Sequence, residues 1–202
     1  MLIFLIRHAE TPGNAARILQ RPDIPLSDLG HDQAERMAER LARVGITAIM
    51  ASDLARAAMT AEHLSRSTGL PVRYETLLHE RNFGDIRGTP YAELDFDPFR
   101  VDYAPPNGES WEAFHERVDR AWAHVLDVAA STDGHLAVVT HGLVCRSLAS
   151  RRFVLPEGAS VPERWENTSI TIVDAHEPWR VALLNCCAHL DGLRSSNASG
   201  II

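Results

Sequence analysis

Short apolar runs of strand length alternate with helix-length amphipathic segments along most of this chain. The run over residues 2–6 is continuously apolar, which is typical of a strand covered on both faces. Similar runs occupy residues 46–51 and 136–140, and residues 27–44 and 53–68 carry apolar side chains at helical spacing. The alternation predicts an α/β fold, a three-layer sandwich in which helices cover both faces of a mainly parallel sheet.

The remaining segments fit the same architecture. Further elements are expected as follows: strands at residues 72–76, 168–173 and 181–185, and helices at residues 109–130 and 143–153. Residues 77–106 are irregular, and a loop of that length in a compact domain is more often functional than idle. A chain of 202 residues suits one domain, which we place at residues 1–190. The polar tail, residues 191–202, is expected to be loose.

Composition excludes several classes of function. The formal net charge is −7, which disfavours nucleic acid as a stable partner. No apolar run approaches the ~20 residues of a membrane span, so we expect no membrane partner. Three cysteines, two of them adjacent, suggest no disulfide framework and a cytoplasmic location. All 20 basic residues are arginine, which excludes chemistry based on a lysine Schiff base or a P-loop lysine.

Cationic and imidazole side chains follow three of the predicted strands. Arg7 and His8 end the first strand, Arg56 lies about one helical turn beyond the second, and His141 ends the strand over residues 136–140. Ligands of such sheets bind at the carboxyl ends of the strands, so these groups are expected to converge there. Arginine forks suit phosphate oxygens, and a histidine can attack phosphorus. In the competing interpretation, Arg56 forms a surface ion pair with Asp53.

Phosphoryl transfer also needs a proton donor for the leaving oxygen. Two carboxyl groups of the irregular segment could supply it, Glu80 and Asp85. The competing interpretation of Glu80 is an exposed ion pair with Arg81 or Arg87. Fixed cationic donors can stabilise the transferring group without a metal ion, so no metal and no cofactor are predicted.

A second phosphatase chemistry has to be weighed against the histidine one. Cys145 and Arg151 have the Cys-x₅-Arg spacing of cysteine-dependent phosphatases. The intervening residues read as helix and contain no glycine that would let backbone amides wrap a phosphate. We therefore interpret this spacing as accidental.

Six blocks of sequence together carry a family resemblance. Arg-His-Ala-Glu-Thr at residues 7–11 looks like the Arg-His-Gly-Glu-Thr signature of the histidine phosphatase superfamily, the phosphoglycerate mutase-like group. The other blocks follow in the family's order: residues 23–34, 52–61, 80–88, 106–110 and 138–142. One block would be weak evidence, but six in order over residues 2–171 are highly specific. The resemblance implies a phosphoglycerate mutase-like fold.

The resemblance also implies roles for individual residues. His8 would be the phosphorylated nucleophile, and Glu80 the general acid that later activates water. Arg7, Arg56 and His141 would hold the phosphoryl group. Asn14 and the amide of Gly142 are implied as further phosphate ligands.

The sequence departs from the family pattern at three places. Ala9 replaces a glycine of the signature, which tightens the space behind His8. The glycine that usually precedes Asp23 is missing, which would bring Arg21 near the substrate. The segment 88–105 is short, and the chain has no counterpart of a lysine that the glycolytic mutases carry nearby.

The short segment and the missing lysine favour a phosphatase over a mutase, and we expect a metal-independent phosphatase that hydrolyses a small phosphorylated metabolite. A phosphoglycerate mutase-type phosphotransferase is the first alternative. A non-catalytic phosphate- or phosphohistidine-binding module is the second. The sequence leaves the physiological substrate and the oligomeric state open.

Overall fold

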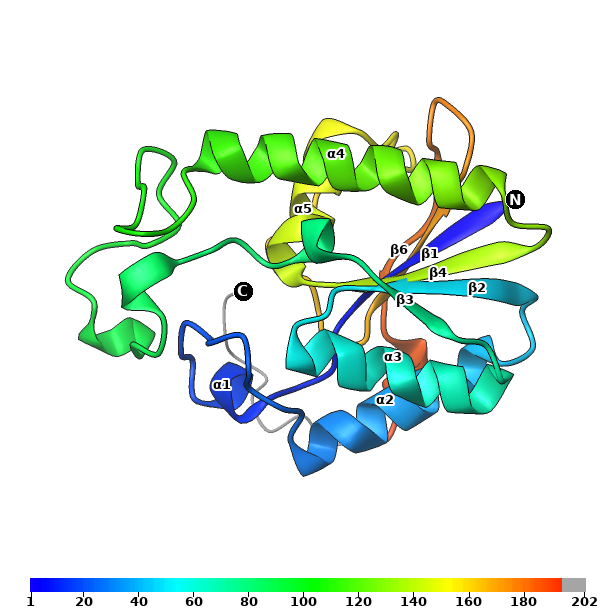
Figure 1. Cartoon of the computed structure of the whole chain (residues 1–202), viewed down its shortest axis with the longest axis horizontal. Coiled ribbons are helices and arrows are strands. Elements are labelled where there is room, and N and C mark those ends of the chain that lie inside the picture. The colour runs from blue at the N-terminus through cyan, green and yellow to red at the C-terminus, as the bar shows by residue number, and fades with distance from the viewer. Residues whose placement is uncertain (194–202) are drawn as a thin grey trace.

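A six-stranded sheet forms the centre of the computed structural model, which describes residues 1–193 (Figure 1). The strand order is β3-β2-β4-β1-β5-β6. The first four in this order are mutually parallel, and β5 runs antiparallel to both β1 and β6. Their bounds are β1 Leu2–Arg7, β2 Ile46–Ala51, β3 Val72–Tyr74, β4 His135–Thr140, β5 Ile170–Asp174 and β6 Val181–Cys186. The predicted tail lies outside the described residues from residue 194 onward.

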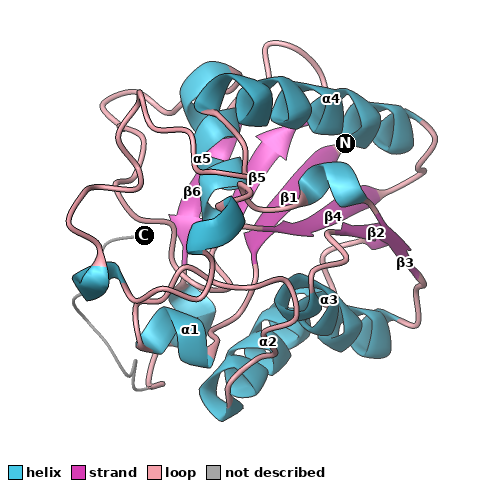
Figure 2. Ribbon diagram, turned by 60° about the vertical axis from the view of Figure 1, so that its left-hand side comes forward, coloured by secondary structure: helices cyan, strands magenta, loops and turns pink. Residues whose placement is uncertain are grey.

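Helices cover both faces of the sheet (Figure 2). Successive side chains of a strand point to opposite faces, so Ile3 and Leu5 pack with one cluster while Phe4 and Ile6 pack with the other. The first cluster includes apolar residues of α4 and α5, and the second those of α2 and α3. The helices are α1 Pro12–Ala15, α2 Asp28–Leu41, α3 Ala55–Thr68, α4 Trp111–Ala130 and α5 Gly142–Arg151. The predicted three-layer α/β sandwich is therefore confirmed.

Helix boundaries differ from the sequence expectation by a few residues, and the starts of α2 to α5 and the ends of α2 and α5 are shifted. The helix expected over residues 27–44 ends at Leu41, and Gly45, with φ +79°, lies in the turn before β2. The sequence offers Ser52 and Asp53 as side-chain caps just before α3, but its N-cap is Leu54, which makes no side-chain capping bond. Ser52 is buried and its hydroxyl contacts His141 instead. A tertiary partner has therefore replaced the local cap.

The predicted irregular segment contains three short 3₁₀ helices, Thr76–Leu78, Gly84–Ile86 and Tyr91–Glu93. In Figure 1 it extends past the carboxyl ends of the parallel strands, on the same side of the molecule as α1. These two segments and the strand ends enclose the site described below. No helix within residues 1–193 combines the length and apolarity that crossing a membrane requires.

Candidate active site

A cavity of about 50 Å³ lies at the carboxyl ends of β1 and β4. These strands are hydrogen-bonded neighbours, and Arg7 pairs with Thr140 at their ends. This register places His8 beside His141, with their ring centroids 5.2 Å apart. Six predicted site residues line the cavity, namely Arg7, His8, Asn14, Arg56, Glu80 and Gly142. The sheet therefore gathers side chains that lie far apart in the sequence.

His8 is buried with one ring nitrogen fixed. Its Nδ1 lies 2.7 Å from the carbonyl oxygen of Ala9. A carbonyl can only accept a hydrogen bond, so Nδ1 carries the proton and Nε2 keeps its lone pair. Burial, Arg56 and Arg7 together hold the pKa of His8 well below its usual range. The neutral, nucleophilic form of His8 is therefore the stable one at neutral pH.

Arg7 and Arg56 bring two guanidinium groups into the cavity wall. Each is held by a backbone carbonyl: Arg7 Nη1 donates to Trp165, and Arg56 Nη1 donates to Arg21 at 3.2 Å. Burial lowers the pKa of Arg56 to about 10, so it stays charged at neutral pH. The Nε atoms of both arginines are buried without a hydrogen-bond partner in the described part of the chain. Buried, unpaired donors on fixed cations form a site that favours an anion.

His141 is the N-cap residue of α5. Its Nε2 lies 2.8 Å from the hydroxyl of Ser52, which itself accepts a hydrogen bond from the Leu54 amide. The hydroxyl hydrogen is then available to Nε2, an arrangement that favours a proton on Nδ1. Nδ1 is buried and, within residues 1–193, has no hydrogen-bond partner. Burial, Arg56 and His8 hold the pKa of His141 well below its usual range, which suits a neutral donor.

Glu80 lies in the cavity wall with both carboxyl oxygens bound to backbone amides. Oε1 accepts from the Arg81 amide at 3.0 Å, and Oε2 from the Leu143 amide in the first turn of α5 at 3.1 Å. Burial raises the pKa of Glu80, although these amides, Arg56 and Arg7 oppose the shift. A raised carboxyl pKa is what a proton donor requires near neutral pH.

Two competing interpretations are wrong, and of the two candidate acids Glu80 lines the cavity whereas Asp85 does not. Asp85 is exposed and bonds to the side chain of Asn107, so Glu80 is the better proton donor. Arg56 is only 3% exposed, and Asp53 contacts His79 rather than this arginine. Glu80 accepts backbone amides instead of forming an exposed ion pair.

The cysteine alternative also fails. Cys145, a residue of α5, is 0% exposed and belongs to the apolar cluster between that helix and the sheet. Burial raises the pKa of its thiol far above the usual value, so a thiolate does not form there at neutral pH. Arg151 is exposed and contacts Asp119. No group of three or more potential metal-ligating side chains occurs among the described residues.

Two of the three residues predicted to bind phosphate or substrate, Asn14 and Gly142, line the cavity, and the third, Arg21, does not. Asn14 lines the cavity, and its Oδ1 accepts from Thr11 Oγ1 at 3.1 Å and Asn167 Nδ2 at 3.3 Å. This leaves the amide NH₂ of Asn14 as its ligand-binding end. Gly142 also lines the cavity, where a Cβ would come 3.5 Å from Arg7 Nε.

Arg21 does not line the cavity. Its side chain is exposed and packs against Gly88, where an added Cβ would lie 2.9 Å from Arg21 Nε. Its contribution to the site is the carbonyl oxygen that holds Arg56. The substitution of Ala9 for glycine is accommodated because its side chain packs in a small apolar cluster with Leu26 and Ala34.

A half-buried ion pair that the sequence did not reveal holds the segment carrying Glu80. Arg117 of α4 contacts Glu109 at 2.7 Å and donates to the carbonyl oxygens of Leu77, His79 and Glu80 at 2.7, 2.8 and 3.3 Å. Glu109 also accepts from the Asn82 amide at 2.8 Å. Helix α4 thereby fixes the backbone on both sides of the candidate acid.

Sequence reasoning also missed the aromatic and cationic wall of the cavity. Arg87, Phe83, Tyr91 and Phe99, all from the irregular segment, line it. Arg81 lines it too, yet its guanidinium lies 4.1 Å from the ring centroid of Trp111 and donates to three backbone carbonyls. No periodicity marks such residues, because an irregular loop has none.

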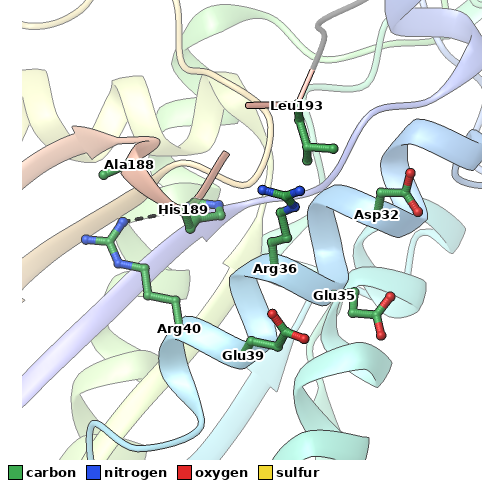
Figure 3. Close-up of a pocket in the computed structure, with 8 residues that line it drawn as sticks. All are labelled: Asp32, Glu35, Arg36, Glu39, Arg40, Ala188, His189 and Leu193. Carbon is green, nitrogen blue, oxygen red and sulfur yellow. Dashed lines mark hydrogen bonds between the residues drawn. The ribbon is translucent and has the colours of Figure 1, made fainter. Parts of the chain in front are cut away.

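A wider hollow of about 970 Å³ lies elsewhere, between α2 and residues 188–193 (Figure 3). Acidic and basic side chains of α2 alternate along it, and Arg40 lies 3.3 Å from His189. Its lining comes from a helix surface rather than from strand ends. The convergence of His8, Arg7, Arg56 and Glu80 therefore distinguishes the smaller cavity as the candidate active site.

Comparison with known proteins places this geometry in a family. Residues 3–186 match the histidine phosphatase superfamily (branch 1). The chain belongs to that superfamily. Members of the histidine phosphatase superfamily are phosphatases or mutases, so the chain is an enzyme of the phosphoryl-transfer class. A Citrobacter koseri protein named "Probable phosphoglycerate mutase GpmB" is 32% identical over 94% of each chain.

Solved structures of the superfamily share the fold. The α-ribazole phosphatase from Shigella flexneri superposes with a TM-score of 0.80 at 26% identity, over 93% of this chain and 98% of that one. A mycobacterial glucosyl-3-phosphoglycerate phosphatase bound to VO₃ gives 0.77 at 28% identity, over 91% and 98%. The predicted phosphoglycerate mutase-like fold is thus confirmed.

Proposed function

We propose that this protein is a metal-independent phosphatase that hydrolyses phosphomonoesters through a phosphohistidine on His8. The observation that carries the proposal is a neutral His8 that lies among buried donors of Arg7, Arg56 and His141, which have no hydrogen-bond partner within residues 1–193. An anionic phosphoryl group satisfies those donors and is held against the nucleophile.

The reaction follows in two steps. Nε2 of His8 attacks phosphorus, the bond from phosphorus to the leaving oxygen breaks, and protonated Glu80 gives its proton to that oxygen. The Glu80 carboxylate then takes a proton from water. The hydroxide attacks phosphorus, the P–N bond breaks, and inorganic phosphate leaves with His8 and protonated Glu80 restored. Arg7, Arg56 and His141 stabilise the negative charge in both steps, while Asn14 and the Gly142 amide lie within the same wall.

Hydrolysis is favoured over mutase activity by two sequence features. The chain contains no lysine, and the segment 88–105 is short compared with the glycolytic mutases that it resembles. Two of the similar solved structures are of proteins titled phosphatases. The name of the Citrobacter koseri relative keeps phosphoglycerate mutase activity as the second candidate.

The deciding assay measures phosphate release from p-nitrophenyl phosphate and a panel of phosphorylated metabolites, in EDTA, between pH 5 and 8. Interconversion of phosphoglycerates is measured in parallel. Metal-free release that His8→Ala abolishes supports the phosphatase, whereas interconversion without release supports the mutase. Neither activity, with phosphate still bound, supports a binding module, and activity that requires added metal contradicts the mechanism.

A further inference from the structure

A second cavity of about 420 Å³ adjoins the candidate active site. It lies between the start of α4, one side of α5 and the irregular segment around residues 99–101. Phe99 and Leu143 line both cavities. The two are therefore neighbours that share a wall, and the second is not a separate surface feature.

The sizes of the two cavities suggest that they bind different parts of one substrate. Sites for small organic ligands usually occupy roughly 300–1,000 Å³. The first cavity, at about 50 Å³, suits the phosphoryl group, and its donors are those of an anion site. The bulk of a larger substrate has to lie beyond it.

The position of Glu80 identifies which side of the phosphoryl group the second cavity occupies. In-line displacement places the leaving oxygen opposite His8, next to the group that protonates it. Glu80 is bound at 3.1 Å to the amide of Leu143, the residue whose side chain forms the shared wall. The second cavity thus adjoins the leaving-group side.

Four of the lining residues are apolar and four are polar; of the polar ones, Arg146 and Ser150 are exposed, and His115 and Ser147 contact each other. Phe99, Val101, Trp111 and Leu143 form the apolar part of the wall, and Val101 is 89% exposed. The polar atoms of the aromatic wall are engaged: Trp111 Nε1 donates to the Arg100 carbonyl at 2.9 Å, and His115 Nδ1 lies 2.8 Å from the Ser147 hydroxyl. The cavity offers contact area rather than a dense set of hydrogen bonds.

We propose that this second cavity binds the leaving group of the substrate, and that this group is an alcohol carrying a large apolar moiety of aromatic size. The inference rests on the proposed function, because it assigns the substrate class of the same site. Phe99 and Leu143 lie between the two cavities and would contact the alcohol where it leaves the phosphoryl cavity, and Val101 belongs to the wall that would face its apolar end.

The test compares propyl phosphate with 3-phenylpropyl phosphate. Both leaving alcohols are primary and unactivated, so the chemical step needs the same help from the general acid. The comparison therefore isolates binding of the phenyl group. We expect kcat/KM to be at least ~10-fold higher for the phenylpropyl ester, the usual scale for burying a group of this size.

Two variants locate the effect. Val101→Asp places a charge in the apolar wall, and Ser150→Phe, on the exposed rim of the cavity, fills it. Each should reduce the preference for the phenylpropyl ester at least ~5-fold. The matched control is Val44→Asp, at an exposed valine before β2, the end of that strand away from the site. The control should keep the wild-type preference.

The outcomes separate this inference from the proposed function. Equal kcat/KM for the two esters, with both readily hydrolysed, overturns the inference and leaves the phosphatase intact. A preference that Val101→Asp and Ser150→Phe both leave unchanged also overturns it. Hydrolysis of neither ester by wild-type protein refutes the proposed function, and the inference fails with it.

Discussion

Replacing Glu80 by glutamine tests the mechanism with little change of shape. The wild-type carboxyl accepts hydrogen bonds from two backbone amides, that of Arg81 at 3.0 Å and that of Leu143 at 3.1 Å. A glutamine has one oxygen, so its NH₂ group faces one amide donor and that hydrogen bond is lost. The substitution also removes the only transferable proton of this side chain.

The expected loss of activity is large. A positioned general acid contributes roughly 10²–10⁴-fold to a rate, so kcat/KM for propyl phosphate should fall by at least ~10². The effect should be smaller for phosphorylation by p-nitrophenyl phosphate, because p-nitrophenolate leaves without protonation. Rapid-quench measurement of phosphoenzyme formation distinguishes this step from its hydrolysis.

The expected loss of stability is small, and its pH dependence has a definite sign. The missing charge-assisted hydrogen bond costs about 1.5–3 kcal/mol, but the burial cost of a carboxylate disappears with it. Burial raises the pKa of Glu80 above its ordinary value of 4.5. The folded wild-type protein therefore binds this proton more tightly than the unfolded chain. Its stabilising contribution is complete below about pH 4.5 and is lost as pH rises through the raised pKa.

The free energy of unfolding of Glu80→Gln should accordingly improve relative to wild type as pH increases through that interval. Urea unfolding at several pH values measures the difference. Propyl phosphate turnover within ~3-fold of wild type would refute the role of Glu80 as the acid. A relative stability that worsens with rising pH would refute the inferred direction of its pKa shift.

Further substitutions test other parts of the site and fold. His8→Ala should lower turnover by at least ~10²-fold and eliminate the acid-labile phosphoenzyme; a labelled phosphoenzyme in this variant would exclude His8 as the nucleophile. The value of kcat/KM should stay high below pH 6.5, because the lowered pKa of His8 keeps its imidazole neutral there. It should fall at higher pH as Glu80 loses its proton. A loss of activity on the acid side centred at pH 6.5 would contradict the lowered pKa of His8. Arg117→Met removes the hydrogen bonds to the carbonyl oxygens of His79 and Glu80. Turnover of propyl phosphate should fall ~10-fold or more, and turnover of p-nitrophenyl phosphate should fall less. Equal losses for the two substrates would indicate a merely structural role for Arg117. Gly30→Ala should destabilise the protein by about 1–3 kcal/mol in urea unfolding, because its Cβ would lie 2.1 Å from the Glu10 carbonyl oxygen, whereas helix propensity alone predicts the opposite sign.

Local patterns in the sequence were sufficient for the architecture. The apolar run over residues 2–6 serves both faces of the sheet, and only a covered central strand can bury it on both sides. Strand ends then determine where functional side chains appear. This is why Arg7, His8, Arg56 and His141 could be predicted as one cluster from the sequence.

Tertiary structure alone decided the states and partners of these groups. Whether Glu80 pairs with Arg81 or lies in the cavity depends on α5, whose Leu143 amide lies 63 residues further along the chain. The low pKa of His8 and the raised pKa of Glu80 come from desolvation, a property of everything packed around them.

The irregular segment, residues 77–106, shows most clearly what the sequence alone does not determine. It lacks a repeating hydrophobic period, so the sequence could not show that Phe99 and Tyr91 line the candidate active-site cavity. Their positions follow from non-local contacts, such as those of Arg81 with the Pro98 and Tyr103 carbonyls. Periodic elements are encoded by neighbours in the sequence, whereas the path of a loop, and with it the shape offered to a substrate, is determined by contacts made only after the chain has folded.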